Sequence, residues 1–410
     1  MSHIATRRTA GVRERERERE SERLEGGFES ECTMSFISWV VRVIAVLWFV
    51  YIASRYIPSL SYLFRKMRLY MSGVLSMLIG TDKKFKSTLK RLADPDAIAA
   101  HADQLATRRV MFIRHGESEW NLVFNRGMNF GLLGRLVAAV MKELSVSLRD
   151  DSVFLDSPLS QLGEQQAKQL LAYVESYEGS GDGKDARVKE CVEILKGEAE
   201  VSAAATGKTG ANFPSSSGRG GRGGVVLWTS NLRRSIATVV IGLWGRLSRN
   251  TGEKVHVQSF LQEISTNVDT LALAEALEVP EMDLSRPLGL THASNKMGSS
   301  GGFSMQKYLD PRGNRGNKPI FGSGLTRLQR FCAAAFRTDC STIIASGHSL
   351  WFKHFFAAYL PRSSTHVSKS RKMKNGAVVS FVLAKGVGSD GKPLYRIDPA
   401  SVVEVYKGFE

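Results

Sequence analysis

The stretch VMFIRHGESEWN, residues 110–121, joins a short apolar run to an arginine, a histidine and a glycine. The apolar run is typical of a buried strand, and His115 would then lie where that strand ends. There the histidine is exposed enough to react, Arg114 can hold a phosphoryl oxygen, and Gly116 lets the backbone approach an anion closely. A histidine satisfied by neighbouring backbone is the competing interpretation of this stretch alone.

Other apolar runs along the chain predict the fold. The predicted strands, each next to a polar or basic motif, are residues 109–113, 225–230, 341–347 and 377–383. Residues 160–176 and 232–248 show helical spacing. This alternation indicates the α/β class, a three-layer α/β/α sandwich with a mostly parallel central sheet. In such sheets the active groups lie at the carboxyl ends of strands, where these motifs fall.

Three segments precede this folded domain, which we expect over residues 105–410. Residues 1–33 contain RERERERE and have little to bury, so we expect a disordered charged tail. Residues 34–56 are apolar over nearly the length of a membrane span, with aromatic residues near both ends, and predict a transmembrane helix. An in-plane interfacial helix and an uncleaved signal-like segment are the alternatives. Residues 57–104 are expected to form a basic juxtamembrane linker, in which 71–80 lie on the membrane or pack on the domain.

The charge of the chain bears on its partners and its location. A formal net charge of +16 favours phosphorylated substrates, nucleic acid or an anionic membrane. By the positive-inside tendency, the basic flank after residue 56 predicts a single-pass membrane protein whose folded domain faces the cytosol. The four cysteines form no CxxC pair, which fits a reducing compartment and indicates neither a zinc site nor a disulfide framework.

Two stretches rich in glycine, serine and arginine, near residues 177–224 and 283–324, predict flexible surface insertions. The GRGGRGG run at 218–224 could bind nucleic acid, but a flexible loop is the preferred interpretation, and we do not expect nucleic acid as a partner. The GKT at 207–209 is not a P-loop, because Ser202 stands where the first glycine should be and no strand precedes it.

Three motifs, followed by a late histidine, resemble in order those of the histidine phosphatase superfamily, also called phosphoglycerate mutase-like proteins. They are Arg114-His115-Gly116-Glu117-Ser118 with Trp120-Asn121, LSQLGEQQA at 159–167, and TSNLRRSIAT at 229–238. The late histidine is His348, which follows a predicted strand. The family commonly has a glycine after that histidine, whereas this chain has Ser349, which puts the close backbone approach there in doubt.

The resemblance implies a role for each matching residue. His115 would be the nucleophile that takes the phosphoryl group, and His348 would donate to the phosphoryl oxygens. Arg114 and Arg234 would hold those oxygens, because guanidinium groups match phosphate geometry, and Asn121 would add a hydrogen bond. Arg233 ranks below its neighbour because on a helix it could point elsewhere.

A leaving alkoxide needs a proton, and Glu263 in SFLQEISTNVD, residues 259–269, matches the family's Leu-x-Glu acid. Asp269 and Glu253 compete for this role, although surface solvation is their default interpretation. His354 and His366 lack a comparable setting, so we do not expect them to act in catalysis. We expect no metal and no cofactor, since no carboxylate cluster with ligand spacing accompanies the histidines.

The segment after Glu263 bears on whether the chain resembles the mutases or the phosphatases of this family. Mutases of the family share an extended Glu-Arg-His-Tyr-Gly segment, where this chain has EISTNVD. The expected activity is therefore that of a metal-independent phosphatase that hydrolyses a phosphomonoester through a phosphohistidine. A mutase-like phosphoryl transferase and a non-catalytic, membrane-tethered phosphate-binding module are the alternatives. The sequence leaves open the substrate, the membrane and the oligomeric state.

Overall fold

The computed structural model describes residues 38–46, 48–85, 89, 94–98, 105–124, 131–179, 183–198, 224–290, 304–388 and 391–410. The chain divides into two compact units, residues 1–65 and 66–410. The expected charged tail, residues 1–33, lies outside the described residues, as do the GKT at 207–209 and nearly all of the GRGGRGG run.

The N-terminal helices differ from the single span expected over residues 34–56. One helix covers Ser38–Ser54, and helix α2 (Pro58–Ile79) follows it. The break occurs just before Pro58, which lacks the N–H that a continuing helix would need. Among the described residues, no single helix is both long and apolar enough to cross a membrane, whereas the bent pair of these two helices meets both criteria when taken together.

The second unit is built on one eight-stranded sheet of order β4-β3-β2-β5-β1-β6-β7, with β8 also paired to β6. Its strands are β1 (Ala106–Arg114), β2 (Val225–Thr229), β3 (Val255–Val257), β4 (Leu309–Asp310), β5 (Thr342–Gly347), β6 (Val378–Val387), β7 (Pro393–Ile397) and β8 (Val403–Tyr406). Strands β4 to β1 in this order run parallel, and β6 is antiparallel to β1, β7 and β8. The predicted α/β class with a central sheet is confirmed.

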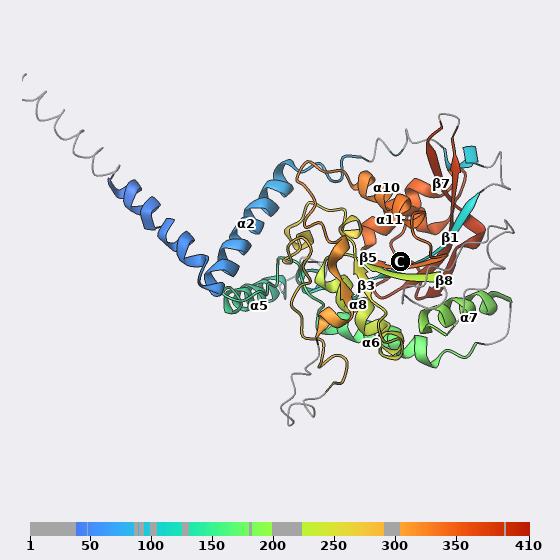
Figure 1. Cartoon of the computed structure of the whole chain (residues 1–410), viewed down its shortest axis with the longest axis horizontal. Coiled ribbons are helices and arrows are strands. Elements are labelled where there is room, and N and C mark those ends of the chain that lie inside the picture. The colour runs from blue at the N-terminus through green and yellow to red at the C-terminus, as the bar shows by residue number, and fades with distance from the viewer. Residues whose placement is uncertain are drawn as a thin grey trace, which may run out of the picture. The chain divides into compact units, whose positions relative to one another are not determined.

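Helices cover both faces of this sheet (Figure 1). In β1, Met111 and Ile113 belong to one core cluster, and Val110 and Phe112 to another, as strand alternation requires. The first cluster includes residues of α6 (Gln161–Ser176), α7 (Gly183–Lys196), α8 (Arg233–Gly242) and α9 (Trp244–Arg249). The second includes residues of α10 (Gly324–Ala335) and α11 (Ser349–Tyr359). The sheet is therefore a buried middle layer whose strand ends alone are free to form a site.

Shorter elements complete the unit. Helices α4 (Glu119–Phe124) and α5 (Gly131–Ser145) share a small cluster around Val123 and Ala139. The 3-10 helices are η4 (Ser259–Leu261), η5 (Val268–Thr270), η7 (Met305–Lys307), η8 (Pro311–Gly313), η9 (Val367–Lys369) and η10 (Pro399–Ser401). The predicted helix over 232–248 is in fact two helices, α8 and α9, which meet at Leu243.

Parts of the predicted insertions and of the predicted linker belong to the core. Helix α7 lies within 177–224 and buries Val188, Cys191, Val192 and Leu195, an i, i+3, i+4, i+7 stripe that its many charged residues conceal in the sequence. Strand β4 lies within 283–324 and pairs with β3. Within the linker expected over 57–104, residues from Lys66 onward belong to the second unit.

Residues 71–80 pack on the domain, which was one of the two expectations for them. They form most of the C-terminal half of α2, and a Cβ added at Gly73 would lie 2.5 Å from Cγ1 of Val268. Residue 73 must therefore be small for α2 to seat against this part of the domain.

Helix α6 holds the loop that follows β1. Ser160 caps the helix by accepting from the backbone N–H of Gly163 (3.1 Å), and its hydroxyl donates to Oε2 of Glu117 (2.9 Å). The backbone N–H of Glu117 donates to Oε1 of Gln166 (2.8 Å). A Cβ at Gly163 would overlap the carbonyl oxygen of Glu117. The LSQLGEQQA motif thus positions the loop that carries the first histidine.

The close contact at Gly163 gives a test of this arrangement. Glycine to alanine within an exposed part of a helix stabilises a protein by about 0.5–1 kcal/mol. Gly134→Ala in α5, where an added Cβ meets nothing within 4 Å, should show this gain. Gly163→Ala should instead destabilise the protein by about 1–3 kcal/mol, because the backbone of Glu117 must move away. Urea denaturation measures both variants, and an equal gain in both would disprove the contact.

Candidate functional site

The parallel pairing of β1 with β5 brings two histidines together. His115 follows Arg114 at the end of β1, and His348 follows Gly347 at the end of β5. The backbone N–H of His115 donates to the carbonyl oxygen of Gly347 (3.1 Å). The two imidazole rings lie 5.0 Å apart between centroids and are tilted by 58°. Both side chains are buried at the carboxyl edge of the sheet, where ligands of open α/β sheets bind.

The hydrogen bond of His115 sets the state of its ring. Its Nδ1 lies 2.5 Å from the carbonyl oxygen of Gly116, which can only accept, so we assign the proton to Nδ1. The other nitrogen, Nε2, then keeps its lone pair. Burial, together with the positive charges of Arg234 and Arg114, lowers the pKa of His115 well below 6.5. His115 is therefore a neutral imidazole at pH 7 whose Nε2 carries the lone pair.

Arg234 approaches the site from the first turn of α8. Its Nη1 donates to the carbonyl oxygen of Asp269 (2.9 Å), and its Nη2 lies 3.3 Å from Oδ2 of the same residue. The hydroxyl of Thr238, one turn later, accepts from the backbone N–H of Gly116 (3.0 Å). One face of α8 therefore carries a cation and also holds the backbone beside His115.

Arg114 is fixed from the other direction. Its Nη1 donates to Oε1 of Glu410 (2.8 Å) and to the carbonyl oxygen of Met373. The sequence offers no signal for the contact with Glu410, because the two residues lie at opposite ends of the domain and no motif links them.

Several buried polar atoms at this site have no hydrogen-bond partner among the described residues. They are Nε of Arg114, Nε of Arg234, and both ring nitrogens of His348. A buried polar group left unpaired costs about 1–3 kcal/mol, so such a set is retained where a ligand supplies the partner. Two guanidinium groups and an imidazole fit an anion, and the planar guanidinium groups suit the oxygens of phosphate in particular.

The second histidine is also neutral. Burial, Arg234 and His115 lower the pKa of His348 well below 6.5, so it offers one N–H donor rather than a full charge. Ser349, which departs from the family's usual glycine, is the first residue of α11 and does not have a positive φ. The backbone conformation at this position therefore does not require glycine.

Glu263 lies at the start of α11. Its Oε1 accepts from the backbone N–H groups of Ile264 and Trp351 (both 2.9 Å), and its Oε2 accepts from that of Leu350 (3.4 Å). These three hydrogen bonds hold the side chain of Glu263 at the first turn of α11, the helix that His348 precedes.

Asp269 is a second carboxyl group at this site. It is buried against Arg234, and its Oδ1 has no partner among the described residues. Burial raises the pKa of Asp269, a shift that Arg234 opposes and Glu263 reinforces. The default expectation of surface solvation is therefore wrong for Asp269. Glu253, the other competitor, is bound to Arg246 (2.6 Å).

A buried lysine, which the sequence did not single out, fastens the loop that carries both carboxyl groups. Nζ of Lys318 donates to the carbonyl oxygen of Glu263 (2.6 Å) and to Oγ1 of Thr270 (3.1 Å), and lies 3.2 Å from Oδ2 of Asp82. Burial lowers the pKa of Lys318 to about 8, although Asp82 opposes the shift. Lys318 escaped notice because it lies in a stretch that reads as a flexible insertion.

Other candidate residues take different places. Nε of Arg233 donates to the carbonyl oxygen of Asp156 (2.9 Å), so this arginine braces the chain before α6. Asn121 lies half-buried on α4, and its contact with an anion stays a prediction. The ring of His354 lies 5.2 Å from that of Phe85. Nδ1 of His366 accepts from the backbone N–H of Ser368 (3.2 Å) at the start of η9.

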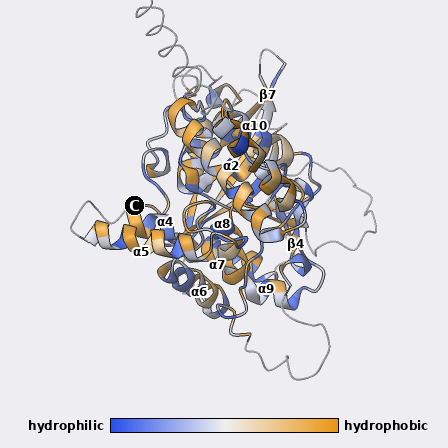
Figure 2. Ribbon diagram, turned by 90° about the vertical axis from the view of Figure 1, so that its left-hand side faces the viewer, coloured by the Kyte–Doolittle hydropathy of each residue, from blue (hydrophilic) through white to orange (hydrophobic). Residues whose placement is uncertain are grey.

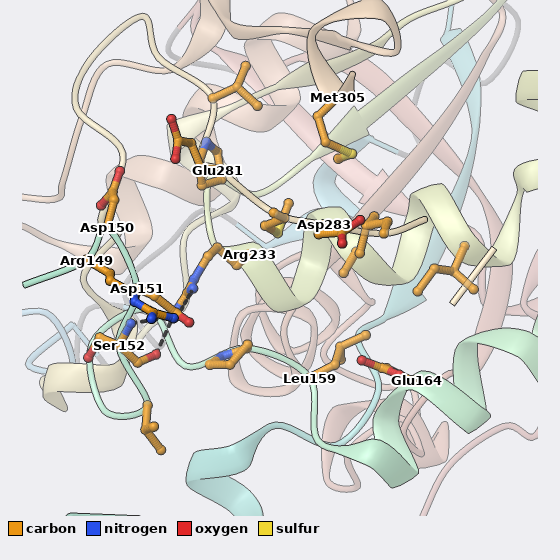
Figure 3. A pocket seen from close by; sticks show the side chains of 18 of the residues that line it. Arg149, Asp150, Asp151, Ser152, Leu159, Glu164, Arg233, Glu281, Asp283 and Met305 are labelled. Carbon is orange, nitrogen blue, oxygen red and sulfur yellow. Dashed lines mark hydrogen bonds and ion pairs between the residues drawn. The ribbon is translucent and has the colours of Figure 1, made fainter. Parts of the chain in front are cut away.

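A separate cavity of about 720 Å³ lies against the neighbouring face of α8 (Figure 3). Arg233, Ala237 and Ile241 line it, at a spacing of four residues, whereas neither histidine does. Its other lining residues include the carboxylates of Asp150, Asp151, Glu164, Glu281 and Asp283. These five carboxylates outnumber the three cations of the lining, Lys142, Arg149 and Arg233, and repel a phosphate dianion, so this cavity is a poor site for a phosphorylated substrate.

No family model and no curated protein sequence matches the chain. Solved structures similar to it include mycobacterial hydrolase 1 (15% identity, TM-score 0.31, covering 74% of this chain and 100% of that one). A mycobacterial glucosyl-3-phosphoglycerate phosphatase is 16% identical with a TM-score of 0.29, covering 71% and 97%. The α-ribazole phosphatase of Shigella flexneri is 13% identical with a TM-score of 0.30, covering 74% and 99%. At such low values these likenesses carry no functional argument, and the geometry of the site has to supply it.

Proposed function

We propose that this chain is a phosphatase that hydrolyses a phosphomonoester through a phosphohistidine formed on His115. One observation carries the proposal: a buried, neutral histidine with a free Nε2 lies beside unpartnered polar nitrogens of Arg114, Arg234 and His348. A nucleophile and a set of anion-binding groups are thereby brought to one point. The resemblance of the motifs to the histidine phosphatase superfamily assigns the same roles to these residues.

In the first step, Nε2 of His115 attacks phosphorus. The N–P bond forms as the P–O bond to the leaving group breaks, and the leaving oxygen takes a proton from a carboxylic acid. Arg114 and Arg234 hold the phosphoryl oxygens, and the N–H of His348 donates to one of them. These fixed donors stabilise the charge that develops during transfer without reorganising.

In the second step, water attacks the phosphohistidine. The carboxylate that gave up its proton accepts one from the water, the new P–O bond forms, and the N–P bond breaks. Inorganic phosphate leaves, and both His115 and the carboxyl group return to their starting states. Covalent capture thus divides one difficult displacement into two easier ones.

Two carboxyl groups, those of Glu263 and Asp269, can serve as the acid. The resemblance assigns the acid to Glu263, whose carboxyl oxygens accept from three backbone N–H groups. Asp269 is buried as well, and burial raises its pKa, which favours the protonated form that an acid needs. Asp269 is therefore the acid that the local chemistry favours, and Glu263, which the sequence motif indicates, is the alternative.

Replacing His115 tests the nucleophile. His115→Ala should lower turnover of 4-nitrophenyl phosphate by at least about a thousand-fold, because no other group can carry the phosphoryl intermediate. His354→Ala is the matched control and should retain turnover. A rapid acid-free quench with ³²P-labelled substrate should give an acid-labile, base-stable label in the wild-type chain alone. Turnover in His115→Ala, or loss of turnover with a chelator, would contradict this mechanism.

The identity of the acid is tested by leaving-group dependence. An alkoxide must be protonated as it leaves, whereas 4-nitrophenolate leaves readily without a proton. Loss of the acid should therefore lower kcat for an alkyl phosphate by about 10²–10⁴-fold and change kcat for 4-nitrophenyl phosphate far less. We expect Asp269→Asn to show this split. If Glu263→Gln shows it instead, the acid is Glu263, and if both substrates suffer equally, the residue only supports the fold.

The state of His115 predicts the pH profile. A nucleophilic histidine must be neutral, and its pKa is lowered well below 6.5 by burial and by two arginines. Activity present above that pKa is lost as pH falls through it, so kcat/KM should stay constant between pH 8 and pH 6.5 and fall only at lower pH. Profiles measured with two aryl phosphates whose phosphate groups differ in pKa separate the titration of the substrate from that of His115. A value of kcat/KM that is already half lost at pH 6.5 with both substrates would show that the pKa of His115 is not lowered.

A further inference from the structure

Two helices of the second unit expose apolar stripes of the same spacing. The stripe on α2 is Met67, Met71, Val74, Leu75 and Leu78, and that on α5 is Leu133, Val137, Val140, Met141 and Leu144. Each follows i, i+4, i+7, i+8, i+11, which falls within about 100° around a helix of 3.6 residues per turn. Every one of these residues is between 41% and 75% exposed. Soluble surfaces carry single apolar residues, but seldom two such stripes together.

The two helices are joined to each other on the flanks of these stripes. Nζ of Lys66 donates to the carbonyl oxygen of Val146 (2.5 Å), just beyond α5, and the hydroxyl of Tyr70 donates to Oε1 of Glu143 (2.9 Å). The opposite face of α2 is buried at Leu69 and Gly73. Figure 2 looks at the side of the molecule on which both helices lie, and apolar residues recur along each. The stripes therefore belong to one surface, which we call the α2–α5 face.

The chemistry of the α2–α5 face favours lipid over a polar partner. Along the chain it follows the helix Ser38–Ser54, whose Trp39, Trp48 and Phe49 are each more than 60% exposed. That helix and α2 together reach the hydropathy of a membrane span. Lipid-compatible sequence thus continues from residue 38 into α2, and helices that lie in the membrane interface present apolar stripes of this kind.

Charge on and beside the two helices has the sign that anionic headgroups attract. Helix α2 has no acidic residue, and its Arg68 keeps 71% of its side chain exposed while paired with Glu275. The one acidic residue of α5 is Glu143, which accepts from Tyr70, whereas Lys142 keeps 53% of its side chain exposed while paired with Glu119. Cations near the surface of an anionic leaflet each add to binding. Lys84, just beyond α2, is also exposed.

We propose that the α2–α5 face docks on an anionic lipid bilayer, with both helices lying in the membrane interface and their apolar stripes among the acyl chains. The segment before residue 66 then brings the domain to the bilayer, and the α2–α5 face holds it there. This assignment does not depend on the phosphatase chemistry. It extends the expected membrane partner from the N-terminal segment and its basic flank to the folded domain itself, on the cytosolic side that the basic flank predicts.

The test measures directly how deeply the α2–α5 face enters the bilayer. The full-length chain, with Cys32 and Cys340 replaced by serine, carries an environment-sensitive dye at Met141→Cys. Vesicles contain phosphatidylcholine with 30 mol% phosphatidylserine, with or without a lipid that carries a quencher high on its acyl chain. The emission of the dye should shift to the blue when vesicles are present, and it should be quenched when the vesicles contain the quencher lipid. The same dye at Val387→Cys, an exposed apolar position on β6, is the matched control and should change little.

Further arms separate the alternatives. Leu133→Asp, Val137→Asp and Leu144→Asp together should abolish quenching at position 141, and turnover of 4-nitrophenyl phosphate reports that the domain stays folded. His115→Ala should bind and be quenched like the wild-type chain, so failure of the phosphatase proposal leaves this result intact. A dye at 141 that stays as solvent-exposed as at 387 on bound vesicles overturns the proposal. So does a blue shift that needs no vesicles and grows with protein concentration, which would assign the face to a second copy of the chain.

Discussion

The site depends on one backbone interaction, the parallel pairing of β1 with β5 that extends to the hydrogen bond from His115 to Gly347. Parallel pairing puts the ends of both strands at one edge, so the residue after each strand projects into a common space. Slipping the register by one residue would move every side chain of β1 to the other face of the sheet. Met111 and Ile113 would then exchange core clusters with Val110 and Phe112, which makes any other register costly.

Burying two arginines beside two histidines creates an electrostatic conflict. Positive charge without solvent is unfavourable: Arg114 is partly compensated by Glu410, and Arg234 donates to the carbonyl oxygen of Asp269. The low pKa values of both histidines keep them neutral, as the proposed nucleophile and donor roles require. In the proposed reaction a phosphate dianion would relieve the remaining imbalance, so the same electrostatic arrangement would both select the anion and prepare the group that attacks it.

The sequence predicts the parts of this structure whose signal is local. An apolar run followed by a distinctive motif is enough to predict β1, β2 and β5, and the helical spacing of residues 160–176 is enough to predict α6. Local patterns could not reveal α7, whose apolar stripe is interleaved with charges, or β4, which is only two residues long. Nor could they reveal that Lys318 holds the loop of Glu263 or that Glu410 contacts Arg114, since such partners are chosen by the folded chain. The histidines could be predicted because each stands in a motif, whereas the burial of Asp269 against Arg234 exists only in three dimensions.

Helix α2 connects the proposed lipid-facing surface with the catalytic edge of the sheet. Its inner face places Leu69 in a cluster with Val268 and Leu271, the residues on either side of Asp269 and Thr270, and Trp120 of the opening motif packs on the same cluster. Just beyond α2, Asp82 accepts from the backbone N–H of Ser265 (3.1 Å) in the same loop. The loop that carries both candidate acids is thus held by a helix whose outer face is apolar and exposed. Closely packed elements move as units, so a force that fixes the outer face of α2 also fixes the position of Asp269 against Arg234.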